Sequence, residues 1–324
     1  MTAPMDSSPQ QNGRRKTILL AAAKVLVSLA AFWLVLRAIN LNALLRQFSD
    51  ADPIWLILGL VTLMVHFALL VWRWNYVLVR IYGLRLGARR LAVVLGVSEA
   101  LGTALPSFVG TDIVRTLALA GAAPLGTVAK AVMVDRVIGL LALLVMIALS
   151  VPLVALTIGQ GPVLALAAAT GIGGLLCYCV GLKLAPHLAR IPAIGGGLSK
   201  LASDLRRVST DIRAMVVLVG CGLLVHLTSV LMLWCAARML NGTIEFLPVL
   251  MIAPTAMVIS SVPISLGGWG VREGALVAGF ALIDANTENI LAASICFGLS
   301  GIGSGLIAVV IAPMLPAPRR MTTP

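Results

Sequence analysis

Two short motifs in an apolar chain contain most of the residues that could do chemistry. The first runs from Pro106 to Arg115 and the second from Pro263 to Glu273, and in both a glycine follows the proline by four residues and an arginine by nine. An arginine offers five N–H donors in a planar fork that suits phosphate, and a helix that begins after a glycine-containing turn presents free N–H groups. The repeated motif therefore predicts a site for an anionic group.

Acidic side chains accompany both arginines. Asp112 lies three residues before Arg115, so on one helix the two would face each other and neutralise each other while the site is empty. Glu273 directly follows Arg272, and adjacent helical residues do not face each other, so we expect Glu273 to find another partner. Such carboxylates inside a membrane could also couple ligand movement to protons.

Further polar residues extend the candidate site. A lone carboxylate such as Glu99 is costly in an apolar stretch unless it lines a cavity or meets a cation. Asp135 begins an apolar run and could reach Lys130, Arg115 or the first hairpin. Its neighbour Arg136 could simply be a topology charge on the inner side of the membrane. The tryptophan of the second motif, Trp269, either gates or lines the cavity, or it wedges the hairpin. The predicted substrate-binding residues are Glu99, Gly110, Asp112, Arg115, Asp135, Arg136, Gly267, Gly268, Trp269, Arg272 and Glu273.

No metal, cofactor or catalytic pattern stands out. His66, His187 and His226 are scattered and have no carboxylate or cysteine at ligand spacing, and the five cysteines lie inside apolar stretches without zinc-site pairing. We find no Ser-His-Asp order and no phosphate-binding Walker loop. We therefore predict a protein without a cofactor that is not an enzyme; the alternative, an enzyme that acts on lipid phosphates, lacks an obvious nucleophile.

Composition places the chain in a membrane. Of its residues 60% are hydrophobic and only 11% are charged, against about 25% charged in soluble proteins. The formal net charge is +12, but lysine and arginine lie mostly between apolar runs, where they set topology and meet anionic lipid headgroups. This distribution favours membrane lipids over nucleic acid as partners.

The apolar runs predict an all-α polytopic membrane protein with about six full spans and two re-entrant hairpins. Each full span is close to the roughly 20 residues that a bilayer requires, and the spans are 17–38, 54–79, 131–157, 162–184, 214–238 and 289–313. Two further regions, about 91–127 and 246–285, are broken by the repeated motif and are expected to be hairpins. A rival count treats each as one or two full spans.

Charge supports this count. Basic segments at 14–16, 80–90 and 183–213 would face the cytoplasm together with the tail 314–324, as the positive-inside rule requires. Three full spans separate the hairpins, so the two would enter from opposite faces as an inverted repeat. The expected units are a disordered cytoplasmic terminus 1–16, a first half 17–184, an amphipathic or solvated linker 185–213, a second half 214–313 and the tail.

Other charged and aromatic residues are assigned to the membrane boundary. Lys24 and Arg73 lie near span ends, where long basic side chains can reach the headgroups, and are expected to have no functional role. Five tryptophans fit an interfacial belt; these are Trp33, Trp55, Trp72, Trp74 and Trp234.

The same motifs resemble a known family. Pro106-x-x-x-Gly110-x-Asp112-x-x-Arg115, Asp135-Arg136-x-x-Gly139-Leu140 and Gly267-Gly-Trp-Gly-Val-Arg272-Glu273-Gly-Ala resemble the lysylphosphatidylglycerol synthase transmembrane-region family of flippase-like bacterial membrane proteins. The resemblance covers nearly the whole chain. It departs at Ser107-Phe108 and Thr111, where the family often has glycine, and we find no soluble aminoacyl-transferase domain in the sequence.

The resemblance implies a flippase-like fold whose substrate is a phospholipid or an isoprenoid-linked lipid, with hopanoid- or glycolipid-related lipids included. It also implies that the polar motif residues bind that substrate. We therefore expect a lipid transporter of the bacterial inner membrane with both termini in the cytoplasm. The alternative is an accessory subunit that positions a lipid-biosynthesis enzyme without moving lipid itself.

Overall fold

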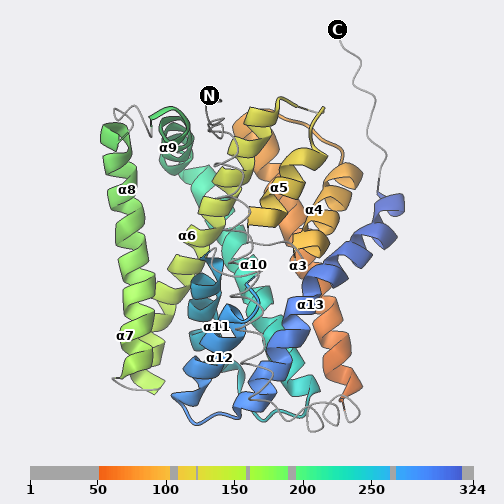
Figure 1. The fold of residues 1–324 in the computed structure, drawn as a ribbon, viewed down its shortest axis with the longest axis vertical. Helices are drawn as coiled ribbons and strands as arrows, with labels where there is room; N and C mark the ends of the chain where they lie inside the picture. Colours follow the sequence, from red (N-terminus) through yellow and green to blue (C-terminus); the bar gives the residue numbers. More distant parts are fainter. Residues whose placement is uncertain are drawn as a thin grey trace, which may run out of the picture.

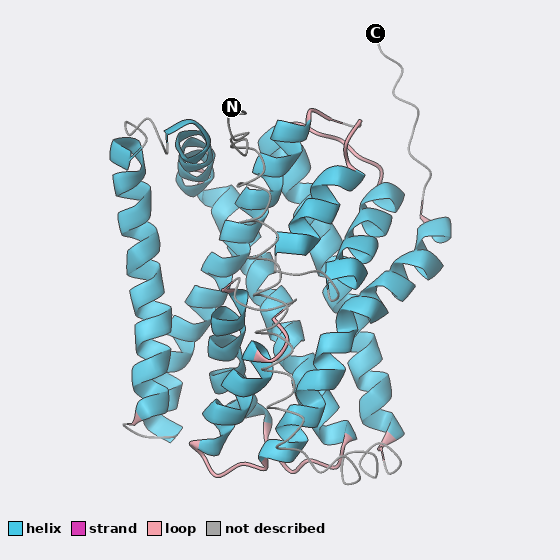
Figure 2. Ribbon diagram, viewed as in Figure 1, coloured by secondary structure: helices cyan, strands magenta, loops and turns pink. Residues whose placement is uncertain are grey.

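The computed structural model describes residues 51–102, 109–121, 123–157, 161–188, 195–262 and 268–315. These residues form helices joined by short connections, with no strand in these ranges (Figure 2). In chain order the elements are α3 (Pro53–Tyr76), η1 (Val77–Ile81), α4 (Ala88–Gly102), α5 (Val109–Ala118), α6 (Leu125–Thr157), α7 (Pro162–Ala168), η2 (Ala169–Gly173), α8 (Gly174–Leu188), α9 (Gly195–Thr210), α10 (Ile212–Met239), α11 (Phe246–Ser261), α12 (Val271–Ala281), α13 (Thr287–Ile311) and η3 (Ala312–Met314). The predicted all-α class is confirmed.

Five helical segments are long and apolar enough to cross a membrane, which confirms a polytopic membrane protein. They are Pro53–Ile81, Leu125–Thr157, Pro162–Leu184, Ile212–Met239 and Thr287–Met314. Each coincides with one of the predicted full spans. The remaining predicted span, 17–38, lies outside the described residues.

Local sequence explains where several of these helices begin. The Asp52 side chain accepts a hydrogen bond from Ile54 N at 3.0 Å and precedes a proline at the first helical position. Asp211 accepts from Ala214 N at 3.1 Å and so caps α10 in the same way. Such side chains satisfy backbone N–H groups that have no partner within the first helical turn.

Two pairs of shorter helices interrupt the spans. Helices α4 and α5 pack against each other, as do α11 and α12. In Figure 1 the first pair lies in the upper half of the bundle and the second pair in the lower half. The residues predicted to break these regions, Pro106 and Pro263, lie outside the described residues.

Polar contacts identify which connections share an end of the bundle. At one end Arg80 lies 3.5 Å from Asp211, and the Tyr82 hydroxyl donates to Asp204 at 3.0 Å. Burial, and then the neighbouring Asp204 carboxylate, raises the pKa of Tyr82. The predicted basic segments 80–90 and 183–213 are therefore neighbours in space.

The opposite end of the bundle is fixed by backbone contacts. Asp52 N donates to Met239 O at 2.9 Å, and the Asn289 amide donates to Leu240 O at 3.1 Å. Helices α3, α10 and α13 thus share this end. Consequently the α4–α5 pair begins and ends at the basic end, and the α11–α12 pair at the other (Figure 1).

Helix α9 lies at the basic end of the bundle (Figure 1). Its residues Ala202, Leu205 and Val208 recur at helical spacing and are buried against the bundle, while Arg206 and Arg207 are exposed. The helix therefore has an apolar face that packs on protein and a basic face that does not.

Small residues allow α4 and α13 to approach closely. A Cβ atom added at Gly96 would lie 2.2 Å from Ala308 Cβ and 3.1 Å from Ser304 O. One added at Gly305 would lie 2.7 Å from Ala100 Cβ. Close approach through small residues is a common way for membrane helices to associate, because lipid tails give apolar side chains little reason to leave the bilayer. The same helix α4 contributes Glu99 to the interior of the bundle.

Candidate functional site

A cavity of about 480 Å³ lies between the two pairs of short helices. Arg115 of α5 and Arg272 of α12, the equivalent arginines of the two motifs, both line it. The predicted site residues in its wall are Glu99, Asp112, Arg115, Asp135, Arg136, Gly268, Trp269 and Arg272. Gly110 and Glu273 are buried outside this wall, and Gly267 lies outside the described residues. Two motifs about 150 residues apart in sequence therefore contribute to one cavity.

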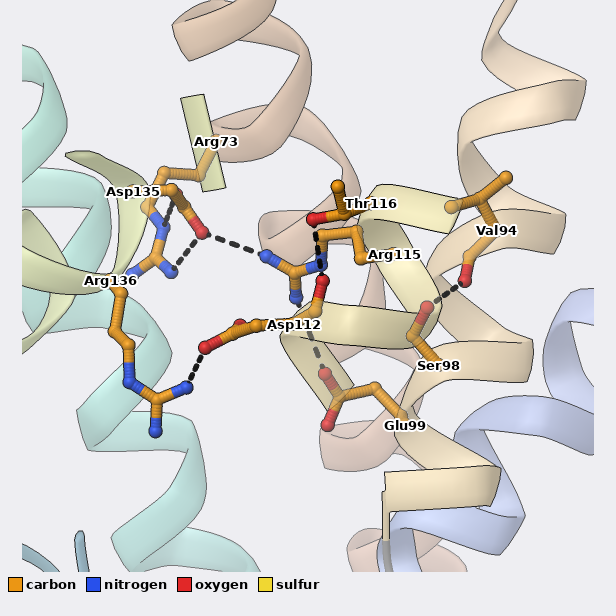
Figure 3. A network of polar contacts seen from close by, with 9 residues as sticks. All are labelled: Arg73, Val94, Ser98, Glu99, Asp112, Arg115, Thr116, Asp135 and Arg136. Atoms are coloured by element: carbon orange, nitrogen blue, oxygen red, sulfur yellow. Dashed lines mark hydrogen bonds and ion pairs between the residues drawn. The ribbon is translucent and has the colours of Figure 1, made fainter. Parts of the chain in front are cut away.

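Asp135 of α6 lies between Arg73 and Arg115 in the charged wall (Figure 3). Its carboxylate accepts from Arg73 at 3.0 and 3.2 Å and from Arg115 Nη1 at 3.1 Å. Arg115 also lies 3.5 Å from Glu99. Charged groups removed from water are tolerated only when such partners surround them. The prediction that Asp135 could reach Arg115 is confirmed.

Asp112 is paired differently from our prediction. Its carboxylate accepts from Arg136 of α6 and makes no hydrogen bond to Arg115 in the described structure (Figure 3). The predicted pair within α5 is therefore wrong. The physical reason is that Arg115 points toward the buried Asp135 of α6, while Asp112, one turn earlier, faces the next residue of that helix. The Asp112–Arg136 pair remains partly exposed to the cavity, with side-chain exposures of 12% and 26%.

Glu273 also departs from the prediction. It was expected to avoid Arg272, yet its Oε1 accepts from Arg272 Nε at 3.0 Å and from Nη2. Its Oε2 accepts from Gly270 N at 2.6 Å. At a helix start the chain before the first turn leaves room for both side chains to fold back, so helical facing rules do not apply there. Gly270 has φ 81°, a conformation that favours glycine.

Arg272 lies in a pocket of aromatic and hydroxyl groups. Its guanidinium carbon is 5.0 Å from the Trp269 ring centre and 5.4 Å from that of Phe297, both within cation–π range. Arg272 also donates to Ser294 Oγ at 3.1 Å and to Ser294 O at 3.2 Å. Of the two alternatives for Trp269, the structure supports cavity lining, since its ring is part of the wall.

Gly298 has no side chain and so leaves room for Arg272 and Trp269. A Cβ atom at Gly298 would lie 2.4 Å from Arg272 Nη2 and 2.6 Å from Trp269 Cη2. The cavity wall on α13 must therefore be glycine at this position for the arginine and the ring to stay where they are.

Sequence reasoning missed four residues of this region. Arg73, expected at the membrane boundary, is only 7% exposed and lines the cavity. Trp74, assigned to the interfacial belt, is fully buried, and its ring lies 5.0 Å from the Arg115 guanidinium carbon. His66 and His226 also line the cavity. His66 and Arg73 are seven residues apart, a spacing that places both on one helix face and could have linked them. Lys24 and Trp33 lie outside the described residues.

The charges of the site balance one another. Arg73, Arg115, Arg136 and Arg272 face four carboxylates, those of Glu99, Asp112, Asp135 and Glu273. If all are ionised, their formal charges cancel. An incoming anion must therefore compete with carboxylates for arginine donors instead of entering a positively charged void.

Comparison with known proteins identifies the family of the chain. None of the curated proteins with which the sequence was compared matches it. The family model described as the lysylphosphatidylglycerol synthase TM region matches residues 21–308, which span the described helices α3 to α12 and most of α13. No soluble domain is evident in the described part of the chain. The chain therefore belongs to the lysylphosphatidylglycerol synthase transmembrane-region family.

Proposed function

We propose that the protein moves a lipid with an anionic headgroup across the membrane, and that Arg115 and Arg272 receive its phosphate. The observation that carries this proposal is that both arginines, one from each broken helix pair, line a single cavity. Transporters built from repeats often bind their substrate where interrupted helices meet. Two planar guanidinium groups suit the three or four oxygens of a phosphate group.

The hydrogen-bond inventory leaves donors for a ligand. Arg272 uses Nε and Nη2 for Glu273 and Ser294, and none of its hydrogen bonds within the described residues involves Nη1. Arg115 Nε is buried and has no hydrogen-bond partner in the described structure. Unsatisfied buried donors are uncommon in folded proteins, so Arg115 Nε favours an acceptor that arrives with the substrate.

When a headgroup enters, the Asp112–Arg136 ion pair would separate before the Arg73–Asp135 pair. It is more exposed to the cavity than the Arg73–Asp135 pair, whose side chains are 8% and 4% exposed. A phosphate that replaces Asp112 at Arg136 would keep that guanidinium satisfied while it enters. The more deeply buried pair would then support Arg115 without changing partners.

The two short helix pairs would act as opposed re-entrant hairpins of an inverted repeat. This proposal is supported by their connections, since α4–α5 begins and ends at the basic end of the bundle and α11–α12 at the other. Opposed hairpins can open a central site alternately to each face. The positive-inside rule would place the basic end, including α9, in the cytoplasm of a bacterium, with both termini on that side of the inner membrane.

A lipid-scrambling assay in liposomes tests the proposal. Purified protein is reconstituted with phosphatidic acid or phosphatidylglycerol that has a fluorescent acyl chain, and movement is followed by chemical quenching of the outer leaflet. Arg115→Lys and Arg272→Lys keep a positive charge beside the buried carboxylates but lose the planar fork. We expect both to slow anionic lipid by roughly tenfold or more.

Arg213→Lys, at an exposed position at the start of α10, is the matched control and should behave as wild type. Equal rates in all three variants, the wild type and empty liposomes would contradict transport. That result, together with co-purification of a lipid-biosynthesis enzyme, would favour an accessory subunit.

A further inference from the structure

We infer that His66 and His226 are specificity-determining residues that accept hydrogen bonds from uncharged hydroxyl groups on the headgroup. The preferred lipid would thus have a phosphate followed by a polyol. This inference rests on the proposed function for the location of the phosphate, and it concerns the part of the headgroup beyond that phosphate.

The hydrogen bonds of His66 fix which of its ring nitrogens is the donor. His66 Nδ1 lies 2.9 Å from Thr228 Oγ1 and 3.2 Å from Val225 O. The Thr228 hydroxyl already donates its one proton to Val225 O at 2.7 Å, and a carbonyl oxygen only accepts. With the Thr228 hydroxyl oriented in this way, Nδ1 donates to the hydroxyl oxygen, and in the neutral ring Nε2 is left as an acceptor. His66 lines the cavity.

The same argument applies to His226. Its Nε2 lies 2.9 Å from Gly139 O, so in the neutral ring Nε2 donates and Nδ1 remains an acceptor. His226 also lines the cavity. No hydrogen bond to His66 Nε2 or to His226 Nδ1 is found among the described residues. Two neutral acceptors thus belong to rings at the edge of the cavity.

Serine hydroxyls add acceptors to this wall. Ser229 donates to Val225 O at 3.0 Å and Ser260 to Met257 O at 2.9 Å. Both serines line the cavity. Since each proton is directed to a backbone carbonyl, the lone pairs of the hydroxyl oxygens remain. This histidine-serine wall therefore offers acceptors, whereas the arginines offer donors.

A polyol fits the histidine-serine wall better than an ammonium group. Gly139 accepts from His226, and a Cβ atom added to Gly139 would lie 3.2 Å from Arg73 Nη1. The guanidinium of Arg73 is therefore close to His226, and because it is already paired with Asp135, that carboxylate is not free to attract a cationic headgroup. Glu99 and Asp112 line the cavity as well, but both are already paired with arginines. Hydroxyl groups donate hydrogen bonds without bringing a positive charge.

A matched pair of lipids tests the inference. Phosphatidylglycerol and phosphatidylpropanol have the same charge and a headgroup of the same three-carbon length, but only the first has free hydroxyls. We would measure both the binding of each lipid to the detergent-solubilised full-length protein and its movement in phosphatidylcholine liposomes. Wild type is expected to prefer phosphatidylglycerol by about tenfold. Phosphatidylpropanol has no hydroxyl donor, so its binding would leave the acceptors of the histidine-serine wall without hydrogen bonds.

Substitutions then assign the preference to residues. His66→Leu and His226→Leu should each reduce the phosphatidylglycerol-to-phosphatidylpropanol ratio by about fivefold. His226→Gln retains an amide donor for Gly139 O together with an acceptor, and should restore part of the ratio if His226→Leu folds poorly. His187→Leu is the matched control, since His187 is exposed on α8, and should retain the wild-type ratio.

The outcomes separate the inference from the proposed function. Selective binding of phosphatidylglycerol without movement would support the inference and contradict transport. Movement of both lipids at equal rates, an unchanged ratio in both leucine variants, or a preference of wild type for phosphatidylethanolamine would overturn the inference and leave transport intact.

Discussion

Arg73 and Asp135 form a two-point ion pair inside the bundle, with Nε 3.0 Å from Oδ1 and Nη2 3.2 Å from Oδ2. They come from α3 and α6 and are 7% and 3% exposed. Both oxygens of the carboxylate are used, and one of them also accepts from Arg115. The pair joins α3 to α6. It also holds the Asp135 carboxylate in the position where it accepts a hydrogen bond from Arg115.

Removing one member of this pair should destabilise the fold. Arg73→Leu leaves the buried Asp135 with Arg115 alone, and we expect the free energy of unfolding in detergent to fall by about 3–5 kcal/mol. The double variant Arg73→Leu/Asp135→Leu should recover part of that loss, since no buried carboxylate is left without its partner. Arg80→Leu is the control: its side chain is 61% exposed, so a change below about 1 kcal/mol is expected. Equal losses at Arg73 and Arg80 would contradict the argument.

Releasing Arg136 should strengthen binding of an anionic headgroup. Asp112→Asn removes the carboxylate that competes with the ligand for the Arg136 donors. The dissociation constant for phosphatidic acid should therefore fall by roughly tenfold, which corresponds to the free energy of about one hydrogen bond to a charged group. Binding to the purified protein in detergent measures this directly. Asp284→Asn, an exposed substitution of the same kind, should leave affinity unchanged; weaker binding by Asp112→Asn would mean that Asp112 contacts the ligand itself.

Gly298 should be needed for activity although it has no side chain. Gly298→Val would push a methyl-bearing carbon into Arg272 and Trp269, and since a shift of about 1 Å in a binding group can cost up to 100-fold in rate, we expect lipid movement to drop by roughly tenfold or more. Gly274→Val on α12 is the comparison, because no atom lies within 4 Å of a Cβ there. Normal transport by the Gly298 variant would show that the Arg272 position is not critical.

The α4–α13 contact should be intolerant of bulk. Gly96→Leu would bring a side chain against Ala308 and the backbone oxygen of Ser304, and overpacking of this kind costs about 1–3 kcal/mol or more. Thermal unfolding in detergent gives the change. Gly220→Leu on α10, where a Cβ meets nothing within 4 Å, should be tolerated. A Gly96 variant as stable as wild type would show that the two helices can separate.

Cysteine labelling from each side of the membrane should distinguish hairpins from full spans. In a background without the five native cysteines, Ala88→Cys and Ala118→Cys mark the two ends of the α4–α5 pair, and Glu245→Cys and Ala281→Cys those of α11–α12. All four positions are exposed. We expect the first two to react only from the cytoplasmic face and the last two only from the other. Labelling of Ala88 and Ala118 from opposite faces would make α4–α5 a full crossing.

The helices were predictable because the bilayer imposes a length and a composition on each span. The predicted 54–79 and 214–238 differ from the observed Pro53–Ile81 and Ile212–Met239 by a few residues at most. Short helices at the two motifs were also foreseeable, since a proline and several glycines interrupt otherwise continuous apolar runs.

The partners within the site were not predictable in the same way. The spacing of Asp112 and Arg115 suggested a pair, but α6 brings Arg136 and Asp135 closer, and only the packing of two helices decides that competition. Arg73 was missed for a similar reason: its position near a span end suggested contact with headgroups, while the bidentate bond to Asp135 draws it inward. Helix length depends on neighbours in sequence, whereas ion pairing depends on neighbours in space.

The balance of positive and negative charges in the site determines how the membrane voltage acts on it. With its four arginines and four carboxylates all ionised, the empty site has no net charge for the transmembrane voltage to act on. Once an anionic headgroup enters, the occupied site gains that headgroup's charge, and each elementary charge that crosses the whole potential experiences about 2.3 kcal/mol per 100 mV. If the protein moves such a lipid, the voltage would bias the loaded step toward the positive side of the membrane, and the return of the empty site would be electrically silent.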